Sequence, residues 1–89
     1  MNNKDIKFFA AEIGAEIPTL DLHGFYPEVA LEKMDYFLYQ CLEKKQNMAR
    51  IIYGGGTGKL KEEVIKALKK FSIVTDYRDS GGSCIIMIE

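Results

Sequence analysis

The feature that most constrains this chain is the glycine-rich run Gly54-Gly55-Gly56-Thr57-Gly58. Residues 50–53 before it have the composition of a buried strand, and apolar residues recur at helical spacing from Leu60 to Phe71. The run therefore lies at a strand-to-helix turn, where glycine allows a close backbone approach and the first amides of the helix have no partner within it. This arrangement predicts an anion-binding site, with phosphate as the first candidate.

Two lysines strengthen the prediction of a phosphate site. Lys59 and Lys61 fall in the first turn of the predicted helix, where the helix dipole disfavours cations. Residues that contradict a local preference, as these cations in the first helical turn do, are typical of functional sites. The plain alternative is a solvated, lysine-rich face beside a glycine turn. The run is not a Walker A motif, because Leu60 stands where Ser or Thr would bind magnesium.

Composition limits the domain count and the partners. A chain of 89 residues forms one domain. Its 12 basic and 13 acidic side chains give a formal net charge of −1, so a nucleic acid would have to be held by a local patch. No apolar run approaches the roughly 20 residues of a membrane span, so we expect neither a membrane partner nor a signal peptide. Cys41 and Cys84 lie in apolar runs, which predicts reduced core cysteines and a cytoplasmic location.

The other patterns predict an α/β fold with the element order β-α-β-α-β-β. From alternating and helical apolar spacing, we expect strands at 19–23, 50–53, 73–78 and 84–88 and helices at 27–42 and 60–70. The last two strands should form a hairpin, and a right-handed crossover should make the first two parallel with both helices on one face. The result is a two-layer βαβαββ sandwich with a mixed four-stranded sheet. Residues 18–89 form this domain, and residues 1–17 form an N-terminal arm that docks on the domain or on a partner.

The first predicted strand carries an acid and a histidine two positions apart. Alternation places Asp21 and His23 on one face of the strand, away from Leu20 and Leu22. Because the carboxyl ends of the first two strands meet at one sheet edge, we expect His23 beside the glycine turn. An aspartate can orient an imidazole and raise its basicity, and histidine titrates near neutral pH. Asp21 and His23 are therefore the predicted catalytic pair, and a purely structural histidine is the alternative.

Three segments together resemble the Smr (small MutS-related) domain family. The segments that resemble its LDLHG, HGxGxGxL and terminal glycine-pair motifs are Leu20-Asp21-Leu22-His23-Gly24, residues 53–60 and Gly81-Gly82-Ser83-Cys84-Ile85-Ile86. The resemblance covers residues 18–89. It implies a sandwich similar to the C-terminal domain of bacterial translation initiation factor three. It also implies nucleic-acid binding and, in many members, nicking or endonuclease activity on DNA or RNA.

Carried onto this sequence, the resemblance implies Asp21 and His23 as catalytic residues. The predicted phosphate- and nucleic-acid-binding residues are Tyr53, Gly54, Gly55, Gly56, Thr57, Gly58, Lys59, Lys61 and Arg78. Tyr53 departs from the family pattern, which usually has histidine there. A phenol can donate a hydrogen bond to phosphate but is a poor base at neutral pH, which puts any activity that depends on that histidine in question.

The working hypothesis is cleavage of RNA at the glycine turn, with His23 taking a proton from the neighbouring 2′-hydroxyl and no cofactor required. Cleavage of DNA by water would ask for a divalent metal, and this cofactor stays open. One alternative is a non-catalytic module that binds RNA, a ribosome or another protein, which Tyr53 and the acidic balance favour. Another is a domain that binds a nucleotide or small anion at the glycine turn alone. The sequence does not decide between RNA and DNA, and it leaves the oligomeric state open.

Overall fold

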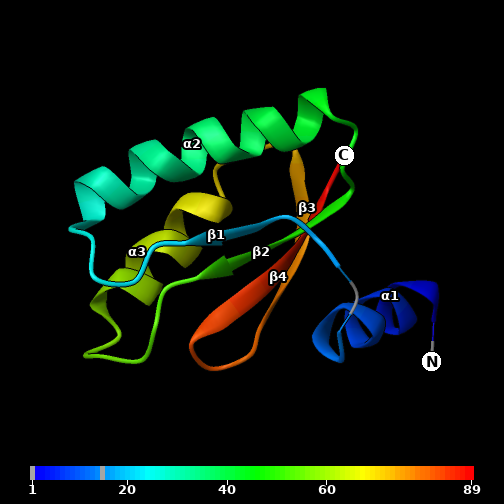
Figure 1. Cartoon of the computed structure of the whole chain (residues 1–89), viewed down its shortest axis with the longest axis horizontal. Coiled ribbons are helices and arrows are strands. Elements are labelled where there is room, and N and C mark those ends of the chain that lie inside the picture. The colour runs from blue at the N-terminus through cyan, green and yellow to red at the C-terminus, as the bar shows by residue number, and fades with distance from the viewer. Residues whose placement is uncertain (1, 15) are drawn as a thin grey trace.

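The computed structural model describes residues 2–14 and 16–89 and contains three helices and four strands within them (Figure 1). In chain order they are α1 (Asn3–Glu12), β1 (Thr19–Asp21), α2 (Pro27–Glu43), β2 (Met48–Ile52), α3 (Lys59–Leu68), β3 (Val74–Asp79) and β4 (Ser83–Ile88). The predicted order β-α-β-α-β-β is confirmed from β1 onward. One further helix, α1, precedes it.

The strands form one mixed sheet in the order β1-β2-β4-β3. β1 pairs in parallel with β2, and β4 pairs antiparallel with both β2 and β3. This confirms the predicted parallel crossover and the terminal hairpin. Because β1 and β2 run in the same direction, their carboxyl ends meet at one edge, where Leu22 donates its amide to the carbonyl of Ile52 at 2.7 Å.

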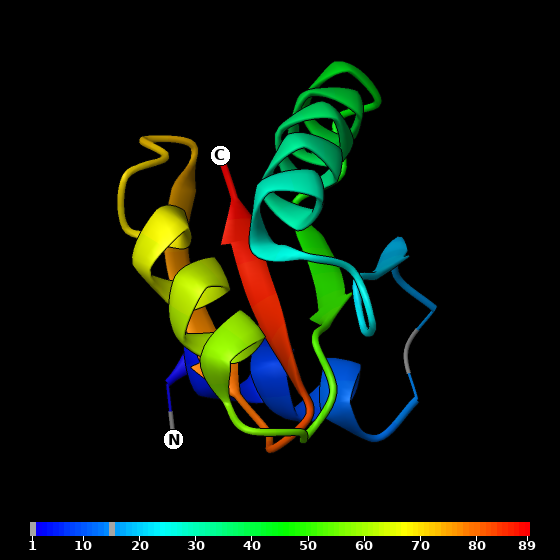
Figure 2. The ribbon, with the colours of Figure 1, turned by 90° about the vertical axis from the view of Figure 1, so that its left-hand side faces the viewer.

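The main core lies between the sheet and the two helices α2 and α3, which cover one face (Figure 2). Helix α2 begins at Pro27, where a missing amide costs nothing, and buries a stripe at spacings of three and four. Both cysteines are buried and free, as expected for core residues. The fully buried side chains of this core include Leu22, Met34, Leu38, Ile51, Val64, Leu68 and Ile86.

Helix α1, which the sequence patterns do not predict, covers part of the opposite sheet face. Asn2 caps it by accepting the amide of Asp5 at 2.8 Å, and Phe8 and Ala11 pack against Ile85. The guanidinium of Arg50 donates to the carbonyl of Ala11 at 2.8 Å. The predicted N-terminal arm is therefore a helix from Asn3 to Glu12, and this helix packs on the sheet face opposite α2 and α3. Positions 1 and 15 of that arm lie outside the described residues.

None of the helices in residues 2–14 and 16–89 combines the length and the apolar character that a membrane crossing needs. The longest, α2, has 17 residues and carries acidic and basic side chains on its outer surface. It is an amphipathic helix of the kind that packs on a sheet.

Candidate functional site

Asp21 and His23 form a close pair at the carboxyl end of β1. The Nδ1 atom of His23 lies 2.6 Å from Oδ1 of Asp21, and the His23 amide donates to the same oxygen at 3.1 Å. These contacts with His23 lower the pKa of the Asp21 carboxyl. An ionised carboxylate only accepts hydrogen bonds, so Nδ1 carries the proton and Nε2 of a neutral ring keeps its lone pair. The His23 side chain is 68% exposed, and the ring that carries the Nε2 lone pair is therefore accessible.

Gly54, the first glycine of the turn after β2, lies directly against His23. A side-chain carbon built on Gly54 would stand 3.3 Å from Cβ of His23, and the residue has a φ of +81° that other residues rarely adopt. Its amide donates to the carbonyl of Gly82 at 2.8 Å, and the amide of Tyr53 donates to the same oxygen at 2.9 Å. Three segments distant in the sequence therefore meet at this edge of the sheet.

The glycine turn forms the floor of a hollow of about 320 Å³. Its lining residues are Gly24, Phe25, Tyr26, Pro27, Tyr53, Gly54, Gly55, Gly56, Thr57, Gly58, Lys59, Leu60 and Lys61. Gly58 caps α3 with a φ of +84° and no side-chain hydrogen bond. The first amide of the helix, that of Lys59, lies 3.4 Å from Oγ1 of Thr57. Among the described residues, no backbone carbonyl accepts from the amides of Gly55 to Gly58. The amide of Gly54, in contrast, donates to the carbonyl of Gly82.

Lys59 and Lys61, the two lysines that follow the turn, differ in their surroundings. Lys61 donates to Oδ2 of Asp79 at 2.8 Å, whereas no ion pair joins Lys59 to another described residue. The other oxygen of Asp79 accepts the hydroxyl of Tyr53, whose side chain is buried. Burial and Asp79 raise the pKa of Tyr53, and Lys61 together with Tyr53 lowers the pKa of Asp79. The Tyr53 hydroxyl, expected to face phosphate, thus faces Asp79, and Lys61 is engaged by the same carboxylate.

Arg78 does not join the other predicted binding residues. It lies on the sheet face covered by α1, where its guanidinium pairs with Asp5 and stands 4.6 Å from the centre of the Phe8 ring. The hollow that it lines contains Asp5, Phe9 and Glu12, and none of the glycine turn. Strand alternation explains the separation, because Asp79 points to the turn and its neighbour Arg78 must point away.

The sequence-based prediction of the site does not include four residues that lie in or near the hollow. Asp79 and Gly82 flank the hairpin turn, and only the terminal glycine pair pointed to that segment. Phe25 and Tyr26 follow the LDLHG segment, and no pattern signalled that two aromatic residues there would be exposed, at 42% and 79%. The positions of all four residues at the site depend on contacts between distant segments, which spacing along the sequence does not reveal.

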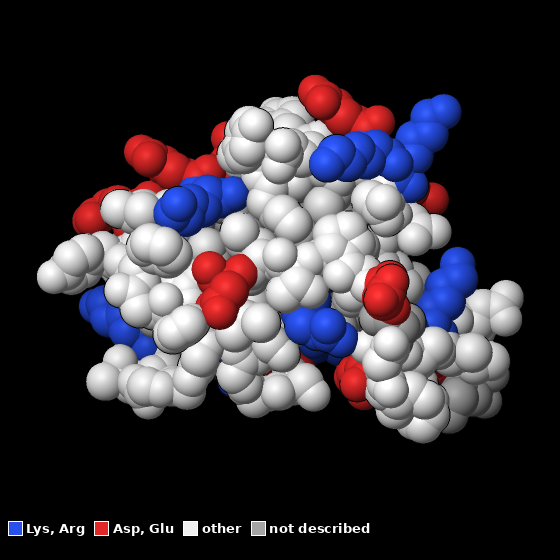
Figure 3. Space-filling model, in the orientation of Figure 1, with Lys and Arg blue, Asp and Glu red and all other residues white. Residues whose placement is uncertain are grey.

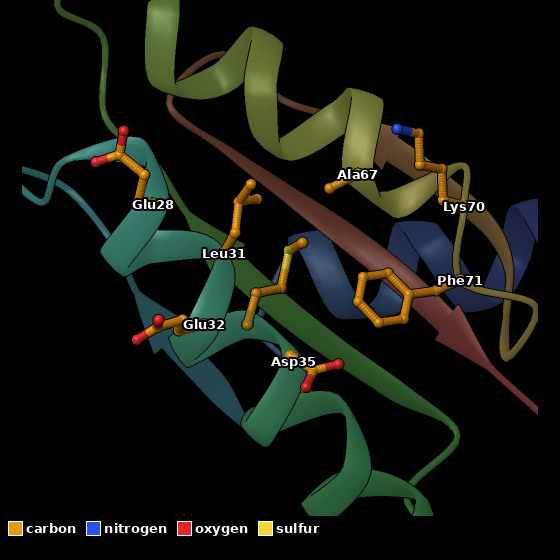
Figure 4. Close-up of a pocket in the computed structure, with 8 residues that line it drawn as sticks. Glu28, Leu31, Glu32, Asp35, Ala67, Lys70 and Phe71 are labelled. Carbon is orange, nitrogen blue, oxygen red and sulfur yellow. The ribbon is translucent and has the colours of Figure 1, made fainter.

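A larger hollow of about 460 Å³ lies elsewhere, between α2 and α3 (Figure 4). Leu31, Ala67 and Phe71 contribute apolar surface, and Glu28, Glu32 and Asp35 line its α2 side. Three carboxylates on one wall repel phosphate. On the face of the described residues drawn in Figure 3, basic and acidic side chains are interspersed rather than gathered into one basic band.

The described residues contain no group of three or more His, Cys, Asp or Glu side chains arranged to hold a metal ion. Asp21 and His23 are only two side chains, and Oδ1 of Asp21 and Nδ1 of His23 are engaged with each other. They would need further ligands from substrate or water to hold a divalent cation.

Comparisons with known proteins identify relatives of this chain and of its fold. Endonuclease MutS2 of Symbiobacterium thermophilum is 41% identical over 64 residues, which are 72% of this chain and 8% of that protein. The chain thus spans less than a tenth of the length of this curated relative. The crystal structure of the Smr domain of Thermus thermophilus MutS2 superposes with a TM-score of 0.79 at 23% identity, covering 82% of this chain and 99% of that one.

The solution structure of the SMR domain of NEDD4-binding protein 2 superposes with a TM-score of 0.67 at 24% identity, covering 85% of this chain and 90% of that one. At these identities the structural likeness establishes the fold. The model of the Smr domain family matches residues 20–89, which contain the His23 pair, the glycine turn and the terminal hairpin. The chain therefore belongs to the Smr domain family.

Proposed function

We propose that this Smr domain binds nucleic acid at the glycine turn and cleaves RNA there, with His23 as the general base. The observation that carries the proposal is the exposed imidazole, held by Asp21 at 2.6 Å and set directly against Gly54. A base with one oriented nitrogen beside a set of unpaired amides suits attack on a phosphate diester. The name of the MutS2 relative, an endonuclease, supports the same class of reaction.

The chemistry needs one proton acceptor and one place for negative charge. Nε2 of His23 takes the proton of a 2′-hydroxyl, and the 2′-oxygen forms a bond to the adjacent phosphorus as the bond to the 5′-oxygen breaks. The leaving 5′-oxygen takes a proton from water, and the imidazolium returns its proton to solvent. The products are a 2′,3′-cyclic phosphate and a 5′-hydroxyl. Amides of Gly55 to Gly58 and the ammonium of Lys59 hold the phosphate and oppose the charge that develops on its oxygens.

Tyr53 supports a second candidate function, a non-catalytic module that binds RNA, a ribosome or another protein. At the position where the family usually has histidine, this chain has a buried phenol that donates to Asp79. If two imidazoles were needed for cleavage, the chain would bind and not cut. The first function is favoured because His23 alone supplies the base that attack by a 2′-hydroxyl requires.

Cleavage of RNA and of DNA of the same sequence separates these functions. The panel contains single-stranded RNA, the same RNA with one 2′-deoxynucleotide, the DNA version and supercoiled plasmid, each with magnesium or with EDTA. We expect cleavage of the RNA in EDTA and its loss only at the deoxy position, because the 2′-oxygen is the nucleophile. Binding without cleavage of any substrate would favour the second function. Magnesium-dependent cleavage of DNA would indicate that the nucleophile is a metal-bound water and not the 2′-hydroxyl.

A further inference from the structure

Two aromatic rings stand exposed at the rim of the glycine hollow. Phe25 and Tyr26 line it from the segment between β1 and α2, opposite the turn that carries Gly54 to Gly58. Tyr26 is 79% exposed and Phe25 is 42% exposed. Exposed apolar surface is unfavourable in water, and Tyr26 gains no compensating contact as the cap of α2, since its side chain makes no capping hydrogen bond.

Backbone contacts fix the segment that carries these rings beside the hollow. The Phe25 amide donates to the carbonyl of Leu22 at 3.2 Å, which ties the segment to the end of β1. Pro27 fixes the backbone immediately after Tyr26. The ammonium of Lys33 lies 4.9 Å from the centre of the Phe25 ring, so a cation accompanies the ring at this rim.

We infer that Phe25 and Tyr26 form a stacking site for unpaired bases, so that the polynucleotide held at the glycine turn is single-stranded. The inference rests on the proposed function, because the glycine turn must hold the phosphate whose neighbouring base reaches the rings. Single strands are bound by this combination, a backbone cradle with aromatic faces on which bases stack, and stacking tolerates any base. Bases in a duplex are already stacked on each other and offer no free face.

The chain contains matched controls for this site. Tyr36 and Tyr39 are 67% and 57% exposed, and both lie on α2 outside the glycine hollow. If aromatic surface alone attracted polynucleotide, they would contribute as much as Tyr26. The inference assigns the contribution to ring position, so Tyr36→Ala should leave binding unchanged.

The test measures fluorescence anisotropy of a labelled oligouridine and of a labelled RNA duplex of equal length, both at one fixed salt concentration. Wild type should bind the single strand more tightly. Tyr26→Ala and Phe25→Ala should each weaken binding of the single strand by about 5- to 150-fold, the usual contribution of one stacked base, with the duplex unchanged. Tyr26→Phe keeps the ring and should bind like wild type, whereas Tyr26→Leu keeps apolar bulk and should bind like Tyr26→Ala.

The outcomes separate this inference from the function on which it rests. Equal loss on single strand and duplex, or no loss in either aromatic variant, would overturn the stacking site while leaving the phosphate site intact. Failure of wild type to bind either polynucleotide at low salt would overturn the proposed function itself. Because Tyr26 is mostly exposed, its variants should fold, and circular dichroism of each variant verifies this before binding is measured.

Discussion

Two aspartates, at the carboxyl ends of the two outermost strands of the sheet, each hold a ring, with opposite results. Asp21 at the end of β1 accepts from His23, and Asp79 at the end of β3 accepts from Tyr53. The His23 side chain is 68% exposed and has a second nitrogen to offer. The Tyr53 residue is 4% exposed, and its one hydroxyl is spent on Asp79, which also binds Lys61.

The difference shows how the same pairing can prepare a group for chemistry or remove it from chemistry. A ring with two nitrogens can be oriented by one and react through the other. A phenol has a single oxygen, and burial raises its pKa further from neutrality. We therefore assign proton transfer to the Asp21 pair, and support of the glycine turn to the network of Tyr53, Asp79 and Lys61.

Among variants that keep both rings, the largest effect should come from Asp21→Asn. An amide carries no charge and can donate to Nδ1 of His23, which selects the tautomer whose Nε2 is protonated and cannot accept. The cleavage rate should fall toward the loss expected for a missing general base, about 10²- to 10⁴-fold, with RNA binding retained. Asp35→Asn, which changes an exposed carboxylate in the hollow between α2 and α3, is the control and should cleave at the wild-type rate. Equal rates for Asp21→Asn and wild type would show that the carboxylate does not orient the base.

A smaller effect is expected from removing the cation that is free to bind. Lys59→Ala should weaken RNA binding and reduce the slope of log affinity against log salt by about 0.7, the contribution of one phosphate contact to a single strand. Lys61→Ala should change that slope less, since Asp79 already neutralises Lys61. Binding titrations over a salt series compare the two. A larger slope change for Lys61→Ala would mean that substrate displaces Asp79.

The Asp79 network should affect stability more than catalysis. Tyr53→Phe removes only the hydroxyl that donates to Asp79, so the free energy of unfolding should fall by about 1 kcal/mol. Cleavage by the folded variant should be unchanged. Tyr39→Phe, an exposed tyrosine on α2, should cost nothing. Urea unfolding of the three proteins measures the difference, and a loss of cleavage without a loss of stability in Tyr53→Phe would give the phenol a direct role.

The smallest effect should appear in acid. Lys61 and Tyr53 hold the pKa of Asp79 below its ordinary value, so the folded state binds fewer protons than the unfolded state at acidic pH. The stabilisation is complete above the ordinary aspartate pKa of about 3.9 and is lost as the pH falls through the lower, folded value. For this partly exposed pair it should amount to less than about 1 kcal/mol. Asp79→Asn should flatten this part of the curve of stability against pH.

Much of the fold follows from local patterns in the sequence. The alternation at Leu20 and Leu22, the helical stripe of α2 and the glycines before α3 each act within a few residues, and each predicted element appears in the structure. Spacing also predicts the pairing of Asp21 with His23, although β1 ends at Asp21 and His23 lies in the turn that follows, where its amide donates to Oδ1 of Asp21.

The parts that sequence reasoning missed depend on contacts between distant segments. The sequence predicts only an arm over residues 1–17, and burial of Phe8 against Ile85 stabilises a helix within it at Asn3–Glu12. The engagement of Tyr53 and Lys61 by Asp79 could not be foreseen, because residues 53, 61 and 79 meet only after the sheet forms. Arg78 was assigned to the binding set on charge alone, and strand alternation sends it to the other face.

One comparison addresses the base at His23 most directly. The cleavage rates of wild type and His23→Ala are measured on the same RNA, at concentrations that saturate both proteins, with affinity determined in parallel. We expect the variant to bind like wild type and to lose cleavage by about 10²- to 10⁴-fold. Cleavage by His23→Ala at the wild-type rate, in protein free of contaminating nuclease, would contradict the role of this histidine as the general base.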